Sequence, residues 1–359
     1  MVLTGRQLFL SSRVVTDSVI IGNGGVLVDE NGIIEKIVTK KQADDIIKAS
    51  DGKIKVVDGG DLALLAGVVD SHVHVNEPGR TAWEGFRTAT SAAASGGITT
   101  IVDMPLNSIP PTTTVANLKT KASSAKGNIF VDVGFWGGVI PGNEDSLQDL
   151  VKAGVVGFKC FLCPSGVEEF PNVTSKDLEK AFDALEGTGS VLAFHAELED
   201  DNDDEPSKKK SKKKDPEEYN TYLESRPSNM ELNAVSLIKD FVEKTDVRVH
   251  VVHVSSADVV PLLVEARKAR TAKGHEGWNS GVTAETCHHY LTFSADEIPK
   301  GKSEYKCAPP IRDKNNKLTP YIGKELKGVV KQTYLRGQLI YDKDDTVGEP
   351  QGKLLLKEA

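Results

Sequence analysis

The sequence of 359 residues lacks the features that mark several classes of protein. No apolar run reaches the roughly 18 residues that a membrane-spanning helix needs, and the first residues lack the long apolar stretch of a signal peptide. The formal net charge is −8, so the composition gives no basic footprint for nucleic acid. The four cysteines are too few for a disulfide scaffold and fit a reducing compartment. We therefore expect a globular cytoplasmic protein that binds neither nucleic acid nor a membrane, with a peroxisomal or mitochondrial location left open.

A glycine-rich Gly-x-Gly-x-x-Gly turn is also missing after the first strand of the main part of the chain. From Gly67 onward, apolar strand patterns alternate with helical patterns, which is typical of a parallel α/β fold. Seven strands are predicted, at residues 67–74, 98–104, 129–139, 155–162, 191–197, 247–255 and 281–291. These units favour a (β/α)8 barrel with its active site at the C-terminal ends of the strands. An open doubly wound sheet is the alternative, which the missing glycine turn disfavours.

Short strand patterns before Gly67 predict a small β-domain, with hairpin turns at Asn23-Gly24 and Asn31-Gly32. A strand, a turn at Arg336-Gly337 and a second strand near the C-terminus are predicted to return to it. We therefore predict a composite β-domain from residues 1–60 and 317–359, and a barrel from residues 61–316. Residues 199–218 form an acidic block followed by a lysine-rich block, which predicts a solvated loop within the barrel segment. A localisation signal or a partner-binding segment is the alternative.

Polar side chains stand at or near the C-terminal ends of several predicted barrel strands. His72 and His74 end the first strand and point the same way, as pairs of imidazoles that hold a divalent metal often do. Lys159 lies in an otherwise apolar strand, where an isolated ammonium is costly to bury. His195 and His253 end the fifth and sixth strands. Because these strand ends meet on one face of a barrel, the five residues predict a metal site.

These motifs, with longer segments around them, resemble the cyclic amidohydrolases and, among them, the allantoinase group. In that family a binuclear metal centre, usually zinc, is held by the His-x-His pair, a carbamylated lysine, two further histidines and an aspartate. The resemblance implies two divalent metal ions held by His72, His74, Lys159, His195 and His253. Carbamylation would turn the buried cation of Lys159 into an anionic ligand, so it also removes the difficulty of burying that side chain.

The residues around the expected metals indicate which group of cyclic amidohydrolases the chain resembles. Dihydroorotases carry an arginine for the substrate carboxylate two residues after the second histidine, whereas this chain has Asn76. The resemblance implies substrate-binding roles for Asn76, Asn107, Cys287 and Pro309. It implies metal-assisted hydrolysis of the allantoin ring to allantoate, in purine catabolism, and it allows a homotetramer. A hydantoinase or dihydropyrimidinase is the alternative enzyme. The lone Cys160-x-x-Cys163 pair predicts packing, because a structural zinc would need a second pair.

The largest absence concerns the family's eighth strand and the catalytic aspartate at its end. The expected Ser-Asp-His-Ser/Ala-Pro motif is missing, and after Arg312 and Asp313 the chain passes directly to a segment that resembles the family's final β-domain tail. The junction looks like an internal deletion of roughly one strand–helix unit, given that a barrel needs eight. Asp313 is the nearest carboxylate but a weak substitute, so no catalytic residue is assigned. We expect an incomplete hydrolase barrel with little or no activity, and an inactive amidohydrolase-fold scaffold is the alternative.

Overall fold

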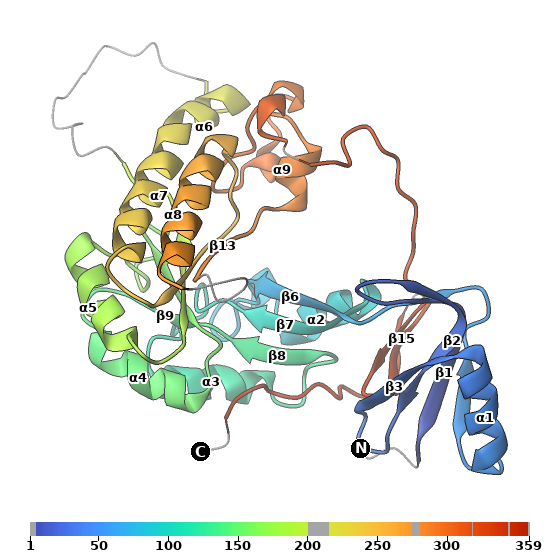
Figure 1. Cartoon of the computed structure of the whole chain (residues 1–359). Coiled ribbons are helices and arrows are strands. Elements are labelled where there is room, and N and C mark those ends of the chain that lie inside the picture. Colours follow the sequence, from blue (N-terminus) through green and yellow to red (C-terminus); the bar gives the residue numbers. More distant parts are fainter. Residues whose placement is uncertain (1–4, 200–214, 275–280, 318, 344, 358–359) are drawn as a thin grey trace, which may run out of the picture. The chain divides into compact units, whose positions relative to one another are not determined.

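The computed structural model describes residues 5–199, 215–274, 281–317, 319–343 and 345–357, and most of the charged block at 199–218 lies outside them (Figure 1). The chain forms two compact units, each built from segments that are distant in sequence. The first unit comprises Met1–Asp103, Lys121–Gly134 and Gly328–Leu355. The second comprises Met104–Thr120, Phe135–Lys327 and Leu356–Ala359. The domain limits expected from the sequence stay a prediction.

The N-terminal part of the first unit is a mixed sheet in the order β3-β2-β1-β4, with β5 also paired to β1. Its strands are β1 (Gln7–Val15), β2 (Ile20–Val28), β3 (Ile34–Thr39), β4 (Lys55–Asp58) and β5 (Ala63–Leu64). Helix α1 (Lys40–Ser50) is capped by Thr39 and Gln42 and packs its Ala43 against Leu8 and Leu27. The strand patterns before Gly67 therefore do form a small β-sheet with its own apolar core.

One of the two predicted hairpin turns in this sheet is wrong. Asn31-Gly32 lies between β2 and β3, as expected, but Asn23-Gly24 lies inside β2. A Cβ added to Gly24 would lie 2.5 Å from the carbonyl oxygen of Val38 on β3. The glycine therefore permits a close approach of two strands rather than a reversal of the chain.

Three further strands of the first unit begin the barrel-type part of the fold, in the sheet order β6-β7-β8. They are β6 (Val68–Val73), β7 (Ile98–Asp103) and β8 (Asp132–Phe135), and β6 pairs with β7 in parallel. Helix α2 (Phe86–Ser95) connects β6 to β7 and ends at Gly96, as the Gly-Gly stop predicts. Helix α3 (Val115–Ala125) follows β7. The first two predicted strand–helix units are thus formed.

The C-terminal segment returns to the first unit as a separate antiparallel sheet. It consists of β14 (Gln332–Leu335), β15 (Gln338–Asp342) and β16 (Asp345–Thr346). The predicted turn at Arg336-Gly337 joins β14 and β15. Thr333 donates a hydrogen bond of 2.7 Å to the carbonyl of Ala94 in α2, and Tyr334 packs edge-on against Phe9 at 4.9 Å. These contacts tie the end of the chain to its beginning.

The second unit contains a five-stranded parallel sheet in chain order, β13-β12-β11-β10-β9. The strands are β9 (Gly137–Gly138), β10 (Phe158–Phe161), β11 (Val191–His195), β12 (Arg248–Val251) and β13 (Val282–Ala284). The helices are α4 (Glu144–Ala153), α5 (Ser175–Leu185), α6 (Tyr219–Ser225), α7 (Ser228–Val242), α8 (Val260–Ala272) and α9 (His288–Thr292). Figure 1 shows α5, α7 and α8 along this unit, and each of the strands β9 to β12 is followed by a helix before the next one.

Each of the seven segments predicted as barrel strands contains a strand, and the third is divided into β8 and β9 around Trp136. The seventh prediction, 281–291, is wrong in its second half, because only Val282–Ala284 is a strand and α9 begins at His288. The described residues between Ala284 and Gln332 contain no strand. The fold class is the α/β arrangement of the barrel type, with an accompanying β-domain. Strand β6 lies at the edge of its sheet, with Val68 and Val69 55% and 59% exposed.

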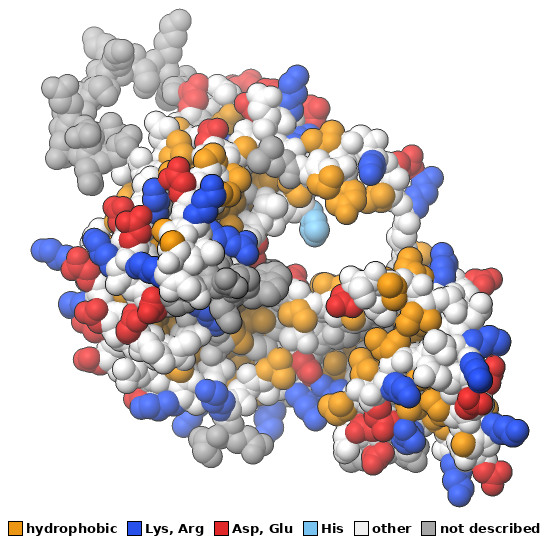
Figure 2. Space-filling view, in the orientation of Figure 1, with side chains coloured by type: hydrophobic (Ala, Val, Ile, Leu, Met, Phe, Trp, Pro, Cys, Tyr) orange, Lys and Arg blue, Asp and Glu red, His pale blue; other side chains and the backbone are white. Residues whose placement is uncertain are grey.

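The described surface carries charges of both signs. Lysine and arginine side chains alternate with aspartate and glutamate on the face shown in Figure 2, and among the described residues of that face no broad area is basic. None of the helices in the described part of the chain is long and apolar enough to cross a membrane.

Candidate metal centre

Lys159, His195 and His253 lie together at the C-terminal side of the sheet of the second unit. Lys159 lies opposite Ala193 in the parallel pairing of β10 and β11, and Phe161 lies opposite His195. The Phe161 ring stacks on the His195 imidazole at 4.6 Å, and the His253 ring meets that imidazole edge-on at 4.7 Å. Three of the five predicted metal ligands therefore occupy one place in the fold.

Lys159 is completely buried, and its Nζ has no hydrogen-bond partner among the described residues. Its Nζ lies 5.1 Å from the centre of the Phe161 ring. Burial lowers the pKa of Lys159 to about 7, because a charged ammonium loses its hydration there. An unpaired and readily deprotonated amine in this position is a nucleophile that can react with carbon dioxide.

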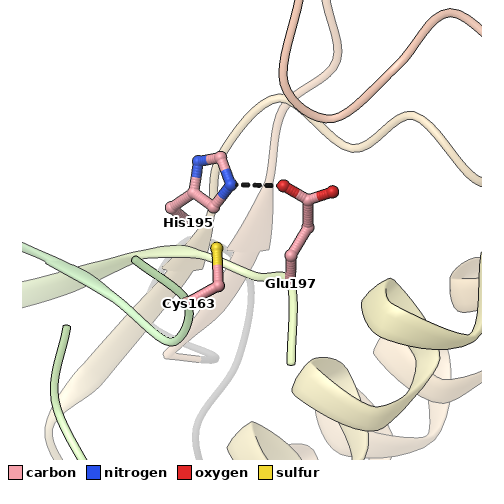
Figure 3. A group of neighbouring side chains, drawn as sticks. All are labelled: Cys163, His195 and Glu197. Atoms are coloured by element: carbon pink, nitrogen blue, oxygen red, sulfur yellow. Dashed lines mark hydrogen bonds and ion pairs between the residues drawn. The ribbon is translucent and has the colours of Figure 1, made fainter. Parts of the chain in front are cut away.

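A second group of side chains surrounds the other edge of the His195 ring. The Nε2 atom of His195 lies 2.6 Å from Oε2 of Glu197 (Figure 3). Arg226 donates to the same oxygen. Cys163, His195 and Glu197 are all buried, and one potential ligand atom from each lies within 4.8 Å of the others. Burial raises the pKa of the Cys163 thiol to about 11, so the thiol is protonated at neutral pH.

Burial also sets the charge of His195 itself. Loss of hydration lowers the pKa of His195, against the opposing effect of the hydrogen bond to Glu197. The ring is therefore neutral at pH 7, as a metal-binding imidazole must be.

The remaining predicted ligands, His72 and His74, belong to the first unit. His72 is in β6 and His74 follows it, with their ring centres 5.5 Å apart. The buried carboxylate of Asp103 accepts a hydrogen bond of 2.8 Å from the backbone of Val75 and one of 2.7 Å from Lys121 Nζ. This ion pair fixes the backbone directly after the histidine pair. The five predicted ligands thus lie in two separate groups, one in each unit, which are called half-sites below.

Backbone conformation marks two of the predicted residues. His253 and Asn76 have φ angles of 39° and 67°, in the left-handed region that residues other than glycine rarely adopt. Asn76 is also buried, and its side-chain amide donates to the carbonyl of His74 at 3.2 Å. Such outliers concentrate where a structure holds a side chain for function.

The other predicted substrate-side residues lie in the second unit. Asn107 is half-buried in the segment after β7. Cys287 caps the N-terminus of α9, and the carbonyl of Pro309 accepts a hydrogen bond of 2.7 Å from Tyr290 in α9. Arg312 donates to the buried carboxylate of Glu231, whose other oxygen accepts from the backbone of Ser255 and Ser256. The segment around Pro309 is therefore anchored beside the loop that follows His253.

Asp313 is exposed and does not belong to the cluster around His195. Its carboxylate accepts hydrogen bonds from the backbone of Asn315 and from the side chain of Asn316, and so caps the short helix η6 (Lys314–Asn316). The nearest carboxylate in sequence to the missing aspartate therefore serves to order a turn.

Sequence reasoning missed Glu197 and Arg226. The spacing of His195 and Glu197, two residues apart at the end of a strand, places both side chains on one side and is a signal that was available. Arg226 gave no such signal, because it reaches Glu197 from a different element, after α6.

Comparison with known proteins shows the family of this chain. Curated relatives include "Allantoinase, mitochondrial" of Aquarana catesbeiana, 50% identical over 76% of this chain and 56% of its own length, and the allantoinase of Streptomyces avermitilis, 48% identical over 73% and 56%. Among solved structures, the L-hydantoinase (dihydropyrimidinase) of Arthrobacter aurescens has a TM-score of 0.70 at 26% identity, covering 89% of this chain and 65% of its own. The dihydropyrimidinase of Brevibacillus agri NCHU1002 has a TM-score of 0.70 at 28% identity, covering 87% and 64%. This chain thus spans little more than half the length of the curated relatives it matches. Residues 63–290 match the model of the amidohydrolase family, and the chain belongs to that family.

Proposed function

We propose that this chain is an allantoinase-type cyclic amidohydrolase that keeps metal ligands but lacks the group needed for efficient turnover. The observation that carries the proposal is the buried, unpaired Nζ of Lys159 beside the rings of His195 and His253. A lysine is tolerated there if it becomes an anionic ligand, and neutral imidazoles next to it are suitable metal ligands. The allantoinases to which the chain is similar support the substrate class.

Two divalent ions, with zinc as the expected metal, would be held by His72, His74, Lys159, His195 and His253, as the family resemblance implies. For this role Lys159 adds carbon dioxide, so that a new bond joins Nζ to carbon and one proton is released. When bound, such ions polarise a carbonyl oxygen and lower the pKa of a water molecule. The residues of the chain contribute the positions of the ligands and the exclusion of water from Lys159.

The substrate is proposed to be allantoin, whose hydantoin ring carries no carboxylate. Asn76 supports this choice because a neutral amide pairs with uncharged carbonyl and amide groups, whereas a buried arginine would need an anion. Asn107, Cys287 and Pro309 are proposed to line the substrate side. Hydantoin and dihydrouracil are the alternative substrates, because the similar solved structures are named hydantoinase and dihydropyrimidinase.

Ring opening requires a proton to be delivered to the leaving nitrogen. The described residues after Ala284 form no eighth strand to carry an aspartate, and Asp313 is used as a cap. General acid–base catalysis is worth roughly 100- to 10,000-fold, so we expect allantoate release to be slower than in a full-length relative by about that factor.

The test combines metal content with turnover. The purified protein, loaded with Zn²⁺ in bicarbonate, is expected to bind metal and to release allantoate at a rate roughly 100- to 10,000-fold below that of the Streptomyces avermitilis relative. A chimera should recover activity if the segment that the relative has, and this chain lacks, is inserted at the junction after Arg312. Turnover within tenfold of the relative would overturn the proposed loss of activity, and the absence of bound metal would overturn the proposed centre.

Association and location complete the proposal. A homotetramer is proposed from the family resemblance, and sedimentation velocity over a range of concentrations tests it. A cytoplasmic location is supported by four cysteines that are all free. One relative is named as mitochondrial, so a fluorescent fusion should be scored against a mitochondrial marker.

A further inference from the structure

The residues that contact the His195 ring belong, like His195 itself, to the second unit. Phe161 covers one face of the ring, His253 meets its edge, and Glu197 takes Nε2. Nδ1 is the ring nitrogen that takes no part in the hydrogen bond to Glu197. The pair of His195 and Glu197 is almost completely buried, with side chains 5% and 0% exposed.

Two roles are open to Glu197. It could bind a metal directly, together with Cys163 and His195, because their potential ligand atoms lie within 4.8 Å of one another. It could instead accept a hydrogen bond from the ring N–H of His195 and so determine which ring nitrogen has a free lone pair. The two roles differ in what they require of Cys163.

Arg226 decides between these roles. Its guanidinium donates to Oε2 of Glu197, the same oxygen that lies against Nε2 of His195, while Oε1 has no hydrogen-bond partner among the described residues. A guanidinium does not lose its proton in proteins, and its fixed positive charge beside the cluster opposes a second cation there. The carboxylate is thereby neutralised by Arg226 and kept in place as a hydrogen-bond acceptor.

We propose that Glu197, held by Arg226, is a positioning residue that keeps His195 in the Nε2–H tautomer and so leaves the Nδ1 lone pair for a divalent cation. Oε2 of Glu197 accepts a hydrogen bond from Nε2–H, with the two atoms 2.6 Å apart, and in a neutral imidazole the other nitrogen is then unprotonated. Carboxylate–histidine pairs of this kind orient metal-binding histidines in other proteins. The inference rests on the proposed metal-binding function, but the tautomer itself does not need a metal.

The first experiment therefore uses the metal-free protein. Long-range ¹H–¹⁵N spectra of the full chain report the tautomer of each histidine, and the His195→Gln variant identifies the signal of His195. We expect the Nε2–H form in the unaltered chain and a mixture of tautomers in Glu197→Ala, because the buried N–H then has no acceptor. The control is Cys163→Ala, which alters the same cluster but not the acceptor of Nε2, and the tautomer should not change.

The second experiment measures Zn²⁺ affinity by competition with a chromophoric chelator. Glu197→Gln, which keeps the shape of the side chain but not its charge, should bind Zn²⁺ about 10- to 100-fold more weakly, while Cys163→Ala should match the unaltered chain within about twofold. This isosteric variant also serves if Glu197→Ala fails to fold. An Nδ1–H tautomer in the unaltered chain, or a Cys163→Ala loss as large as that of Glu197→Gln, would overturn the inference. If the unaltered chain binds no Zn²⁺, the proposed function fails, and the tautomer measurement still decides the role of Glu197.

Discussion

The two half-sites differ in how firmly the fold holds them. His195 stands on β11, the middle strand of a five-stranded sheet, and the last four residues of that strand are buried. His72 stands on β6, at the edge of a three-stranded sheet, and every residue of β6 is exposed or half-buried. One half-site is therefore built into a core, and the other lies on a strand with an open side.

The missing strand explains this difference. A closed barrel has no edges, so its first strand pairs with its last and is covered on both faces. The described residues of this chain supply no strand after β13 to do so for β6. The deletion expected from the sequence would thus remove a catalytic aspartate and, in addition, the cover of the strand that bears the His72–His74 pair. The strands that carry Lys159 and His195 keep both of their neighbours.

The largest effect on stability is expected at the ion pair of Asp103 and Lys121, which anchors the half-site of His72 and His74. Lys121→Met leaves the carboxylate of Asp103 buried without a cation, and breaking a buried ion pair in this way lowers the free energy of unfolding by about 3–5 kcal/mol. Urea unfolding followed by circular dichroism measures the change. Lys152→Met is the control, because its ion pair with Asp149 is mostly exposed and contributes about 0–1 kcal/mol. Equal effects of the two variants would show that Asp103 is not an anchor of the first unit.

A gain in stability, rather than a loss, is expected from a substitution in the buried half-site. Lys159→Met replaces an unpaired buried amine by an apolar side chain of similar length, and replacing buried charges in this way often stabilises a protein by about 1–4 kcal/mol. In buffer with a chelator and without bicarbonate, thermal unfolding should shift upward, while the Zn²⁺ content of loaded protein falls.

Lys180→Met is the matched control for this gain, because the ion pair of Lys180 with Glu144 lies at the surface. A stability change of less than about 1 kcal/mol is expected for it. A loss of stability in Lys159→Met would mean that the amine is already satisfied in the metal-free protein, and the case for a modified lysine would be weakened.

The sequence predicted the strands better than it predicted the contacts between them. Apolar runs such as that around Lys159 are bounded by turn residues, so local pattern alone indicated where each of the seven strands lies. It did not show that the seventh ends at Ala284 and that helix α9 begins at His288. The prediction of a turn at Asn23-Gly24 was wrong because the same dipeptide suits both a turn and a close approach of two strands. Only the position of Val38 on the neighbouring strand distinguishes these two cases. The pairing of Arg226 with Glu197 could not be predicted, because it depends on how a loop folds back over a strand end.

The smallest expected change in stability gives the most direct test of the comparison between the half-sites. The same type of substitution, valine to threonine, can be made on a strand beside each of them. Val249→Thr places a hydroxyl in a strand position of β12 that is 0% exposed and should lower the free energy of unfolding by about 1–3 kcal/mol. Val69→Thr in β6, where the side chain is 59% exposed, should change it by no more than about 0.5 kcal/mol. If urea unfolding gives the two variants equal losses, Val69 must be covered in solution. Repeating the measurement at lower protein concentration would then identify the cover: a loss that fades on dilution indicates that the open side of β6 pairs with a second copy of the chain.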